Sequence, residues 1–381
     1  MVQGIVDTKD AGEGVEHFNG LLSPGFINCH CHLELSHMKG LIPKHTGLVD
    51  FVFKVVNERH FEEAEILAAI QKGEDELLKN GIVATGDICN YTLTIPQKTK
   101  ERLHYHNFIE ASGFPPSVAE TRFDRSRIIL ESYRSTSNLP VRQAGLQHST
   151  ISPHAPYSVS PEMFGMINEF PNNDIISIHN QETVAENEFF EKGSGELLRM
   201  YEKMGIDISF FKPSGKSSLQ TWFPYFNKGQ SIILVHNVHT SAEDLEFIKK
   251  TTDDRPRTNG LPTPDSRLST FLCLCPNANL YISNTLPDVN LLSRHHCNIV
   301  LGTDSLASND QLSILEEIRT LHKNFPSLNL STLLQWATIN GARALQMDDQ
   351  LGSFEKGKMP GVILIEGTDE RNVGSVVRRI L

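Results

Sequence analysis

No apolar run in this sequence approaches the roughly 20 residues that a membrane-spanning helix needs. The net charge of −11 comes without any cluster of Lys and Arg, which argues against nucleic acid or an anionic membrane as a partner. The start of the chain lacks a charged-then-apolar signal pattern, and the six cysteines show no disulfide-type spacing. We therefore expect a cytoplasmic protein with reduced thiols; a homo-oligomer is compatible with this composition.

What the sequence does contain is an alternation of apolar strands and helix signals. Gly81 stands where residues 61–80 would end as a helix, and Ser160, Ser241 and Ser331 stand as N-caps of later helices. Near-continuous apolar runs are typical of parallel strands buried on both faces. Eight such strands favour a (β/α)₈ barrel over an open doubly wound sheet, for which no glycine-rich fingerprint is present. The predicted strands cover residues 25–28, 82–89, 107–111, 146–152, 174–180, 231–237, 270–275 and 298–304.

The two ends of the chain are predicted to form a separate small β-domain. We divide the chain into residues 1–23, a barrel over residues 24–345, and residues 346–381, so that both termini contribute to one small β-sandwich. The sequence predicts short strands at residues 4–6 and 21–22 and stronger ones near the C-terminus, at 361–365 and 375–380. We expect the N-terminal strands to pair with the C-terminal ones. Residues 251–269 are polar, contain three prolines, and are interpreted as an insertion after the sixth strand.

The first barrel strand runs directly into His30-Cys31-His32. Side chains alternate on a strand, so we expect His30 and His32 on one face and Cys29 and Cys31 on the other. Two imidazoles on one face can hold one metal ion. The alternatives are a pair of partly exposed histidines at a strand end, or a structural zinc knot of alternating Cys and His. Strand geometry disfavours the knot, because thiols and imidazoles would point in opposite directions.

Other predicted strands also end in residues that bind metals or transfer protons. These are His154, His179 with Glu182 close behind it, His236, and Asp304. In a barrel, functional side chains come from the carboxyl ends of the strands. One histidine at such a place usually serves only to satisfy a polar neighbour, but this set together indicates a metal site.

Several of these segments resemble the amidohydrolase superfamily. The motifs PGFINCHCHLE, SPHAPYSVSPE, HNQET, LVHN and LGTDSLAS occur in the order found in its cytosine deaminase and triazine hydrolase-like branch. Within that branch, HCHLELSHMKG, FIEASGF and LGTDSLASNDQLSILEEI are most similar to aminodeoxyfutalosine deaminases. The resemblance implies a (β/α)₈ barrel, one catalytic divalent metal ion, and a small β-sandwich made by the termini.

The resemblance also implies roles for individual residues. The metal would be zinc, with iron as the other candidate, because three imidazoles and a carboxylate suit both ions. The implied metal ligands are His30, His32, His179 and Asp304. Glu182 would shuttle protons, and His236 would sit beside the reacting water, so that with Asp304 they form the catalytic set. The alternative interpretation is that Glu182 is an ordinary solvated carboxylate on a loop, without a catalytic role.

Substrate contacts are less strongly specified. Glu34 and Ser36 follow the metal pair and His154 ends a strand, so these three are predicted to bind substrate, although His154 could equally brace its own loop. Aromatic candidates for stacking on a ring are Phe51, Phe53, Trp222 and Phe223, although isolated aromatic residues more often belong to a core.

The sequence lacks lysine from Glu101 to Glu191, where two-metal members of the superfamily carry a bridging carboxylated lysine. We therefore predict a mononuclear hydrolase that deaminates an amino-substituted N-heterocycle, with a 6-aminopurine nucleoside, and aminodeoxyfutalosine first, as substrate. The alternatives are guanine or pterin deamination, triazine dechlorination or amide hydrolysis at the same metal site, and a metal-binding scaffold without catalysis.

Overall fold

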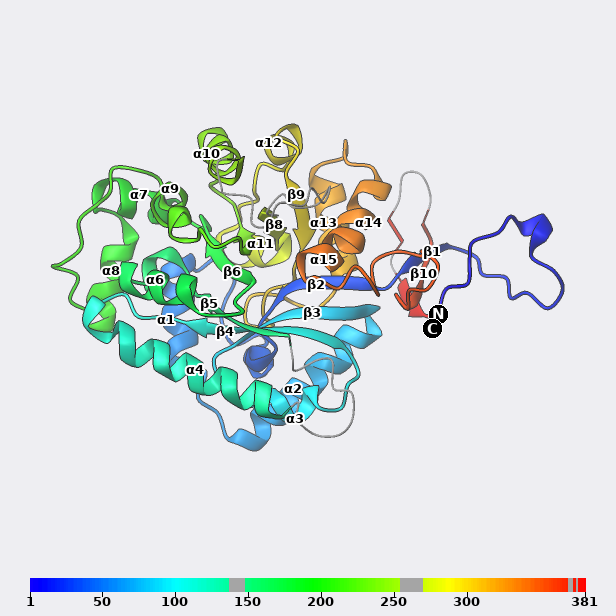
Figure 1. Ribbon diagram of the computed structural model, residues 1–381, viewed down its shortest axis with the longest axis horizontal. Helices are drawn as coiled ribbons and strands as arrows, with labels where there is room; N and C mark the ends of the chain where they lie inside the picture. The colour runs from blue at the N-terminus through cyan, green and yellow to red at the C-terminus, as the bar shows by residue number, and fades with distance from the viewer. Residues whose placement is uncertain (137–147, 254–269, 369–372, 375) are drawn as a thin grey trace.

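The computed structural model describes residues 1–136, 148–253, 270–368, 373–374 and 376–381, and these contain eight parallel strands in two four-stranded sheets (Figure 1). The sheet orders are β2-β3-β4-β5 and β6-β7-β8-β9. The strands are β2 Phe26–Cys31, β3 Ile82–Cys89, β4 His104–Ala111, β5 Ser149–Pro153, β6 Ile175–Asn180, β7 Ser231–His236, β8 Thr270–Leu274 and β9 Asn298–Leu301.

Backbone hydrogen bonds at two seams close the sheets into a barrel. At one seam the amide of His179 donates to the carbonyl of His154, and at the other the amides of Thr303 and Asp304 donate to the carbonyl of His30. The predicted (β/α)₈ barrel is confirmed. Three of the four predicted metal ligands lie on these seams.

Helices surround the barrel, and most of the predicted helix ends are correct. The helix expected at residues 61–80 spans Glu63–Lys79 and is followed by Gly81 with φ +76°. The hydroxyl oxygens of Ser160 and Ser241 accept the amide hydrogens of Met163 and Asp244, as N-caps do. The helices are α1 Leu48–Glu58, α2 Glu63–Lys79, α3 Ile95–Lys98, α4 Ala119–Thr136, α6 Pro161–Glu169, α7 Val184–Lys192, α8 Glu196–Met204, α9 Ser218–Trp222, α10 Ala242–Asp253, α11 Pro276–Ser283, α12 Val289–Arg294, α13 Ile314–Asn324, α14 Leu330–Ala337 and α15 Ile339–Ala344.

The predicted cap at Ser331 is wrong. The side chain of Asn329 accepts the amide hydrogen of Thr332 at 2.8 Å, so α14 begins two residues earlier than a Ser331 cap would allow. The helix also does not continue unbroken to Leu345. Thr338 adopts φ −128° and ψ −93°, and this non-helical residue separates α14 from α15.

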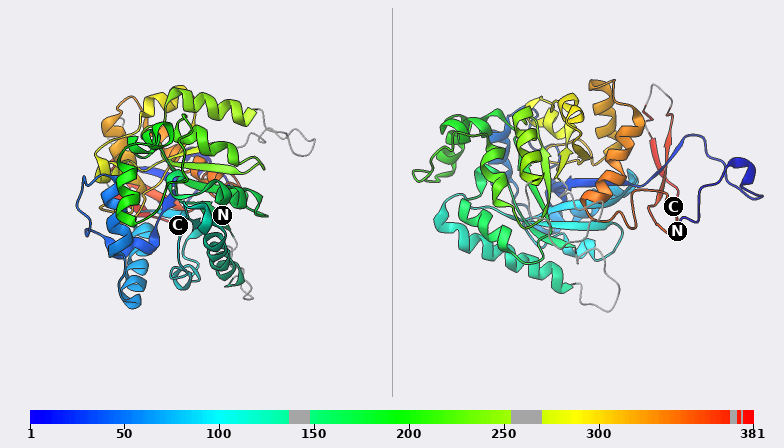
Figure 2. Two further views of the ribbon diagram at one scale, coloured as in Figure 1. Left: turned by 90° about the vertical axis from the view of Figure 1, so that its left-hand side faces the viewer. Right: turned by 45° about the horizontal axis from the view of Figure 1, so that its top comes forward.

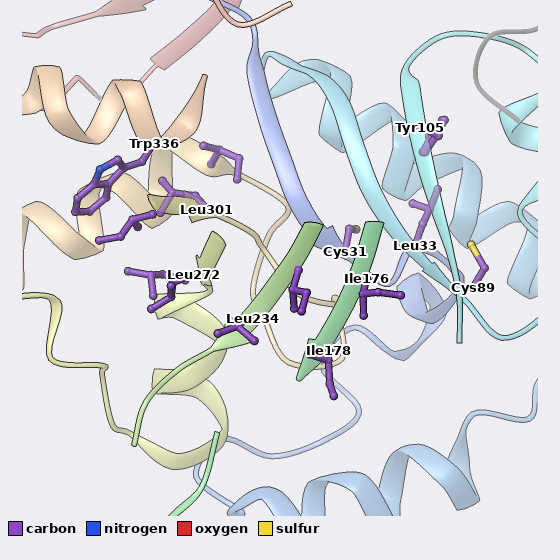
Figure 3. Close-up of a cluster of buried hydrophobic side chains, with 14 of the residues drawn as sticks. Cys31, Leu33, Cys89, Tyr105, Ile176, Ile178, Leu234, Leu272, Leu301 and Trp336 are labelled. Atoms are coloured by element: carbon purple, nitrogen blue, oxygen red, sulfur yellow. The ribbon is translucent and has the colours of Figure 1, made fainter. Parts of the chain in front are cut away.

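The barrel strands bury both of their faces. In β7, Ile232 and Leu234 belong to the cluster that packs against the surrounding helices, and Ile233 and Val235 belong to a second buried cluster. This alternation explains why the strands are apolar throughout. Figure 3 shows part of the first cluster, with Leu272 and Leu301 of neighbouring strands on the side of Trp336 of α14.

The termini together form one small antiparallel sheet at one end of the barrel, which confirms that both contribute to a small β-domain, but the described residues form a single sheet and not the predicted sandwich (Figure 2). Its order is β1-β10-β11, with β1 Leu21–Pro24, β10 Val362–Glu366 and β11 Val376–Arg379. The strand expected at residues 4–6 does not form, and residues 1–20 project from the sheet as a loop with one short 3₁₀ turn at Thr8–Asp10. Because β2 starts beside this sheet and runs away from it, the carboxyl ends of the barrel strands lie at the opposite side.

Two sequence predictions fall wholly or partly outside the described residues. The expected strand at residues 146–152 is described only from residue 148, and β5 occupies Ser149–Pro153. Of the predicted insertion at residues 251–269, α10 includes the first three residues, and the rest is outside the described ranges. No helix in the described ranges has both the length and the hydropathy to span a membrane.

Candidate metal centre and active site

Four buried side chains converge at the carboxyl ends of three strands. They are His30 and His32 at the end of β2, His179 in β6, and Asp304 just after β9. One ligand atom from each residue lies within 4.8 Å of those of the other three. The structure therefore brings together all four residues that the sequence predicted as metal ligands.

The distances among these atoms fit one small cation. The Nε2 atoms of His30 and His32 lie 3.1 Å apart, and Oδ1 of Asp304 lies 3.5 Å and 3.3 Å from them. Ligand atoms placed about 2.0–2.1 Å from a tetrahedral zinc ion lie about 3.3–3.4 Å from each other. Three neutral nitrogens and a carboxylate are also a donor set that zinc binds. The residues present thus fit a divalent metal.

The protonation states suit the same purpose. Burial lowers the pKa of His32, and burial together with its neighbouring histidines lowers the pKa of His179, so both rings are neutral. Burial alone would raise the pKa of Asp304, but its hydrogen bond with His30 and the adjacent imidazoles hold it well below the usual range. A metal site needs this combination of neutral imidazoles and ionised carboxylate.

Neighbouring groups fix the ligands in place. Nδ1 of His179 lies 2.8 Å from the carbonyl oxygen of His154, which turns its Nε2 towards the other ligands. The hydroxyl of Ser308 donates to Oδ2 of Asp304 at 2.6 Å, which leaves Oδ1 facing the histidines. Asp304 and His236 have φ values of +57° and +76°, an uncommon conformation for residues other than glycine that often marks functional sites.

The register of β2 departs from the alternation that the sequence predicted. The pairing of β2 with β3 shifts between Asn28 and Cys31, and the two thiols end up in different buried clusters, Cys29 with Ile27 and Cys31 with Phe26. The expectation that Cys29 and Cys31 share one face is therefore wrong. The irregularity still brings the His30 and His32 rings together.

Glu182 and His236 lie next to the ligand set. Glu182 follows β6 and His236 ends β7, and Nε2 of His236 is 3.7 Å from Oε2 of Glu182. Burial, with a contribution from Asp304, raises the pKa of Glu182 well above its usual range. Burial lowers the pKa of His236 to about 3. A protonatable acid and a neutral imidazole thus stand beside one another at the metal site.

These residues open into a cavity of about 700 Å³. His32, His179, Glu182, His236 and Asp304 all line it, together with apolar side chains that include Phe51, Phe114, Tyr157, Met200 and Ile282. A cavity that combines an apolar wall with convergent polar groups is typical of a small-molecule site.

Of the three residues predicted to bind substrate, one lines the cavity and two do not. His154 lines the cavity, with its Nδ1 2.8 Å from the hydroxyl of Ser158. Glu34 and Ser36 lie in the 3₁₀ helix Leu33–Met38 and are not among the described residues that line the cavity. An oxygen of Glu34 accepts the Asn90 amide hydrogen, and the Ser36 hydroxyl donates to the Leu33 carbonyl.

Of the four aromatic residues predicted to stack on a substrate ring, two line the cavity and two do not. Phe51 and Phe53 line the cavity. Trp222 and Phe223 do not, because both are buried in the outer core, where Trp222 stacks on Phe164 with ring centroids 6.1 Å apart. Stacking of these two on a substrate is therefore a wrong prediction.

Sequence reasoning missed two residues that hold the site. Asn279 in α11 places its amide nitrogen 3.0 Å from Nδ1 of His236, and Ser308 binds Asp304. Ser308 lies inside the motif LGTDSLAS and only four residues beyond Asp304, so its position was a usable signal. Asn279 lies on a helix after the strand and carried no such signal.

The chain resembles proteins of known identity over almost its whole length. The model of the amidohydrolase family matches residues 21–379. An adenosine deaminase of Helicobacter pylori is 26% identical, over 89% of this chain and 77% of its own length. The crystal structure of Helicobacter pylori aminofutalosine deaminase with methylthio-coformycin has a TM-score of 0.73 at 23% identity, covering 95% of this chain and 87% of that one. An adenosine deaminase structure from Xanthomonas campestris with bound zinc has a TM-score of 0.66 at 20% identity, covering 91% and 72%. With its barrel and its family match from residue 21 to residue 379, this chain belongs to the amidohydrolase family.

Proposed function

We propose that this protein is a mononuclear zinc aminohydrolase that replaces an exocyclic amine of a purine nucleoside with oxygen. The observation that carries the proposal is the joint placement of a three-histidine, one-aspartate set with Glu182 and His236 at one cavity wall. A scaffold that only bound metal would need neither of the last two residues. The overall reaction consumes water and releases ammonia.

The metal is proposed to be held by His30, His32, His179 and Asp304. A zinc ion bound by these residues would supply Lewis-acid activation of water at neutral pH. The family relative from Xanthomonas campestris was crystallised with zinc, which supports this choice over iron. The protein's own contribution is to orient the ligands, and the contacts of His179 with the His154 carbonyl and of Asp304 with Ser308 support this role.

Glu182 is proposed to carry protons between the reactants. It is buried and lines the cavity beside Asp304, and burial raises its pKa well above the usual range, so that it holds a proton more readily than an exposed glutamate does. It would take a proton from the attacking water and deliver one to the ring nitrogen next to the amine-bearing carbon. A second transfer to the amine would allow ammonia to leave.

His236 is proposed to stabilise charge on the incoming oxygen. Its Nδ1 faces the amide nitrogen of Asn279, which donates to it, so that the ring proton is on Nε2. This places a neutral N–H donor on the side of Glu182 and the cavity. Such a donor, fixed before the reaction starts, favours the charged transition state.

The substrate class follows from the cavity and from the relatives. A 6-aminopurine has the N–C–NH₂ arrangement on which Glu182 can act, and a cavity of about 700 Å³ is larger than a nucleoside alone requires. Phe51 and Phe53 offer faces for an aromatic ring, and His154 offers a polar contact for its substituents. Named relatives are deaminases of adenosine, of 5′-deoxyadenosine and of 5-methylthioadenosine or S-adenosylhomocysteine. A 6-aminopurine nucleoside with an enlarged 5′ substituent, aminodeoxyfutalosine first, is therefore proposed.

The test is an ultraviolet assay of purified, zinc-loaded protein. Conversion of the adenine to the hypoxanthine chromophore, with matching ammonia release, is expected for at least one of adenosine, 5′-deoxyadenosine, methylthioadenosine, S-adenosylhomocysteine and aminodeoxyfutalosine. No spectral change with any of these substrates would overturn the proposal. Guanine, a pterin and a chlorotriazine, followed by ammonia and chloride release, would then distinguish the other reactions of the same metal site.

A further inference from the structure

A fully buried ion pair lies behind the metal ligands, outside the cavity. Asp87 near the end of β3 and Lys98 at the end of α3 have completely buried side chains, and Nζ of Lys98 lies 2.5 Å from Oδ2 of Asp87. Neither residue lines the cavity among the described residues, so neither can touch substrate in this arrangement. Removing two opposite charges from water costs free energy, and their mutual attraction offsets this cost only when the geometry is excellent. A buried pair therefore contributes little net stability, which suggests that it has another role.

The ammonium group of Lys98 makes several contacts that fix its position. Besides Asp87 it donates to the side-chain oxygen of Asn107 at 2.7 Å and to the thiol sulfur of Cys89 at 3.2 Å. The ring centroid of Tyr105 lies 4.9 Å from Nζ, and that of Tyr133 lies 5.3 Å away. All three ammonium hydrogens therefore have acceptors, and Lys98 holds Asp87 in one orientation.

The other oxygen of Asp87 reaches the metal segment. Its Oδ1 accepts the backbone amide hydrogen of Leu33 at 2.8 Å. Leu33 follows His32 directly, at the point where β2 has ended and the 3₁₀ helix Leu33–Met38 begins. His32 has φ −118° and ψ 77°, a conformation outside both the helix and the regular strand, so its backbone needs support from outside the strand.

We propose that Asp87 is a positioning residue for the metal site, which fixes the backbone after His32 through the amide of Leu33 and is itself fixed by Lys98. The Nε2 atom of His32 is thereby held 3.1 Å from Nε2 of His30, where both can bind one metal ion. Loss of a partner that orients a metal ligand typically lowers metal affinity by about 10–100-fold. The inference rests on the proposed ligand set.

The test compares two double variants that both remove the ion pair. Asp87→Asn with Lys98→Met keeps an oxygen that can accept from Leu33, and Asp87→Leu with Lys98→Met has a similar shape without an acceptor. Zinc affinity, measured by competition with a chelator, is expected to be at least about tenfold weaker in the leucine variant than in the asparagine variant. Equal affinities in the two folded variants would overturn the proposal.

A control separates positioning from general destabilisation. Glu74 in α2 is equally buried and accepts from Tyr105, Gln97 and Arg102, but not from the His30–Leu33 segment. Glu74→Gln is expected to lower the urea midpoint and leave zinc affinity unchanged. If Glu74→Gln weakened zinc binding as strongly as the leucine variant, the assigned role of Asp87 would be wrong.

Hydrogen exchange of the unmodified protein gives a measurement that does not depend on variants folding. In metal-free protein the amide of Leu33 is expected to exchange as slowly as the amides of β2, because its acceptor is in place without metal. Fast exchange would overturn the proposal even if a variant failed to fold. If the unmodified protein bound no zinc at all, the ligand set would be wrong instead, whereas slow exchange would still show that Asp87 holds Leu33.

Discussion

Nε2 of His236 lies 3.7 Å from a carboxylate oxygen of Glu182, and both side chains are almost completely buried. Burial lowers the pKa of His236 to about 3 and raises the pKa of Glu182, so the pair avoids two opposite charges in the apolar interior. In the proposed mechanism, the neutral His236 ring donates a hydrogen bond and Glu182 holds the proton to be transferred. This division of roles is what an amine-to-oxygen exchange requires from the protein.

Glu182→Gln should separate proton transfer from metal binding. The amide has almost the same shape as the acid but cannot shuttle protons, so kcat is expected to fall by about 10²–10⁴-fold while zinc content stays at the parent level. Turnover and elemental analysis of the same preparation measure both. Glu186→Gln, the same substitution four residues later in α7 and away from the cavity lining, is the matched control and should keep kcat within a few-fold. A Glu182→Gln variant with near-parent turnover would refute the assigned shuttle.

Metal content should be one ion per chain. The described residues hold a second group, Glu110, His154 and His179, whose atoms also lie close enough for a metal. That group shares His179 with the first set, so the two cannot be filled independently. His30→Ala should lose zinc and activity together, because it removes a ligand from the first set and leaves the second intact. Elemental analysis that found two tightly held ions in the parent would contradict the mononuclear site.

His236→Ala should keep the metal and lose turnover, since His236 is not in the ligand set. Asn279→Ala removes only the group that orients the His236 ring, so a smaller fall in kcat is expected, again with full zinc content. The order of the two kcat values, measured at saturating substrate, checks this arrangement. A larger loss from Asn279→Ala than from His236→Ala would show that Asn279 acts directly.

The candidate ligands were predictable because parallel strands all end on one side. A polar residue at the end of each apolar run, as in His179 and Asp304, must then meet its counterparts, whatever the helices between them do. Residues beyond the strand ends were predicted less well. Glu34 and Ser36 follow the ligands closely, but a tight 3₁₀ helix turns them away from the cavity.

Contacts between distant segments explain the other misses. Asn279 and Lys98 act on residues more than a few positions away, and nothing in their local sequence says which neighbour they meet. Trp222 was expected near substrate only because it is aromatic, and its large apolar area instead places it in the outer core. The position of Asp87 at a strand end matched the pattern of the ligands, and only the structure shows that it turns to the backbone of Leu33.

Stability should respond to pH through Glu186. This residue is fully buried; its Oε1 accepts from the amide of Gln181 and the hydroxyl of Ser218, and its Oε2 has no hydrogen-bond partner among the described residues. Burial raises its pKa from 4.5 to about 7, although the hydrogen bonds from Ser218 and Gln181 act in the opposite direction. The folded state therefore binds a proton more tightly than the unfolded chain.

The sign of the effect follows from that difference. The stabilising contribution of protonated Glu186 is complete below about pH 4.5 and is lost as the pH rises through about 7. Glu186→Gln mimics the protonated acid at every pH. Its free energy of unfolding, measured by urea denaturation with zinc present, should therefore gain on that of the parent protein between about pH 5 and about pH 8. Both proteins share every other titrating group, and because the charge of Glu186 also raises the pKa of Glu182, the difference reports this carboxyl together with its effect on Glu182. A difference that stayed constant over this range would show that Glu186 is already ionised in the folded protein, with its charge balanced by the two donors on Oε1.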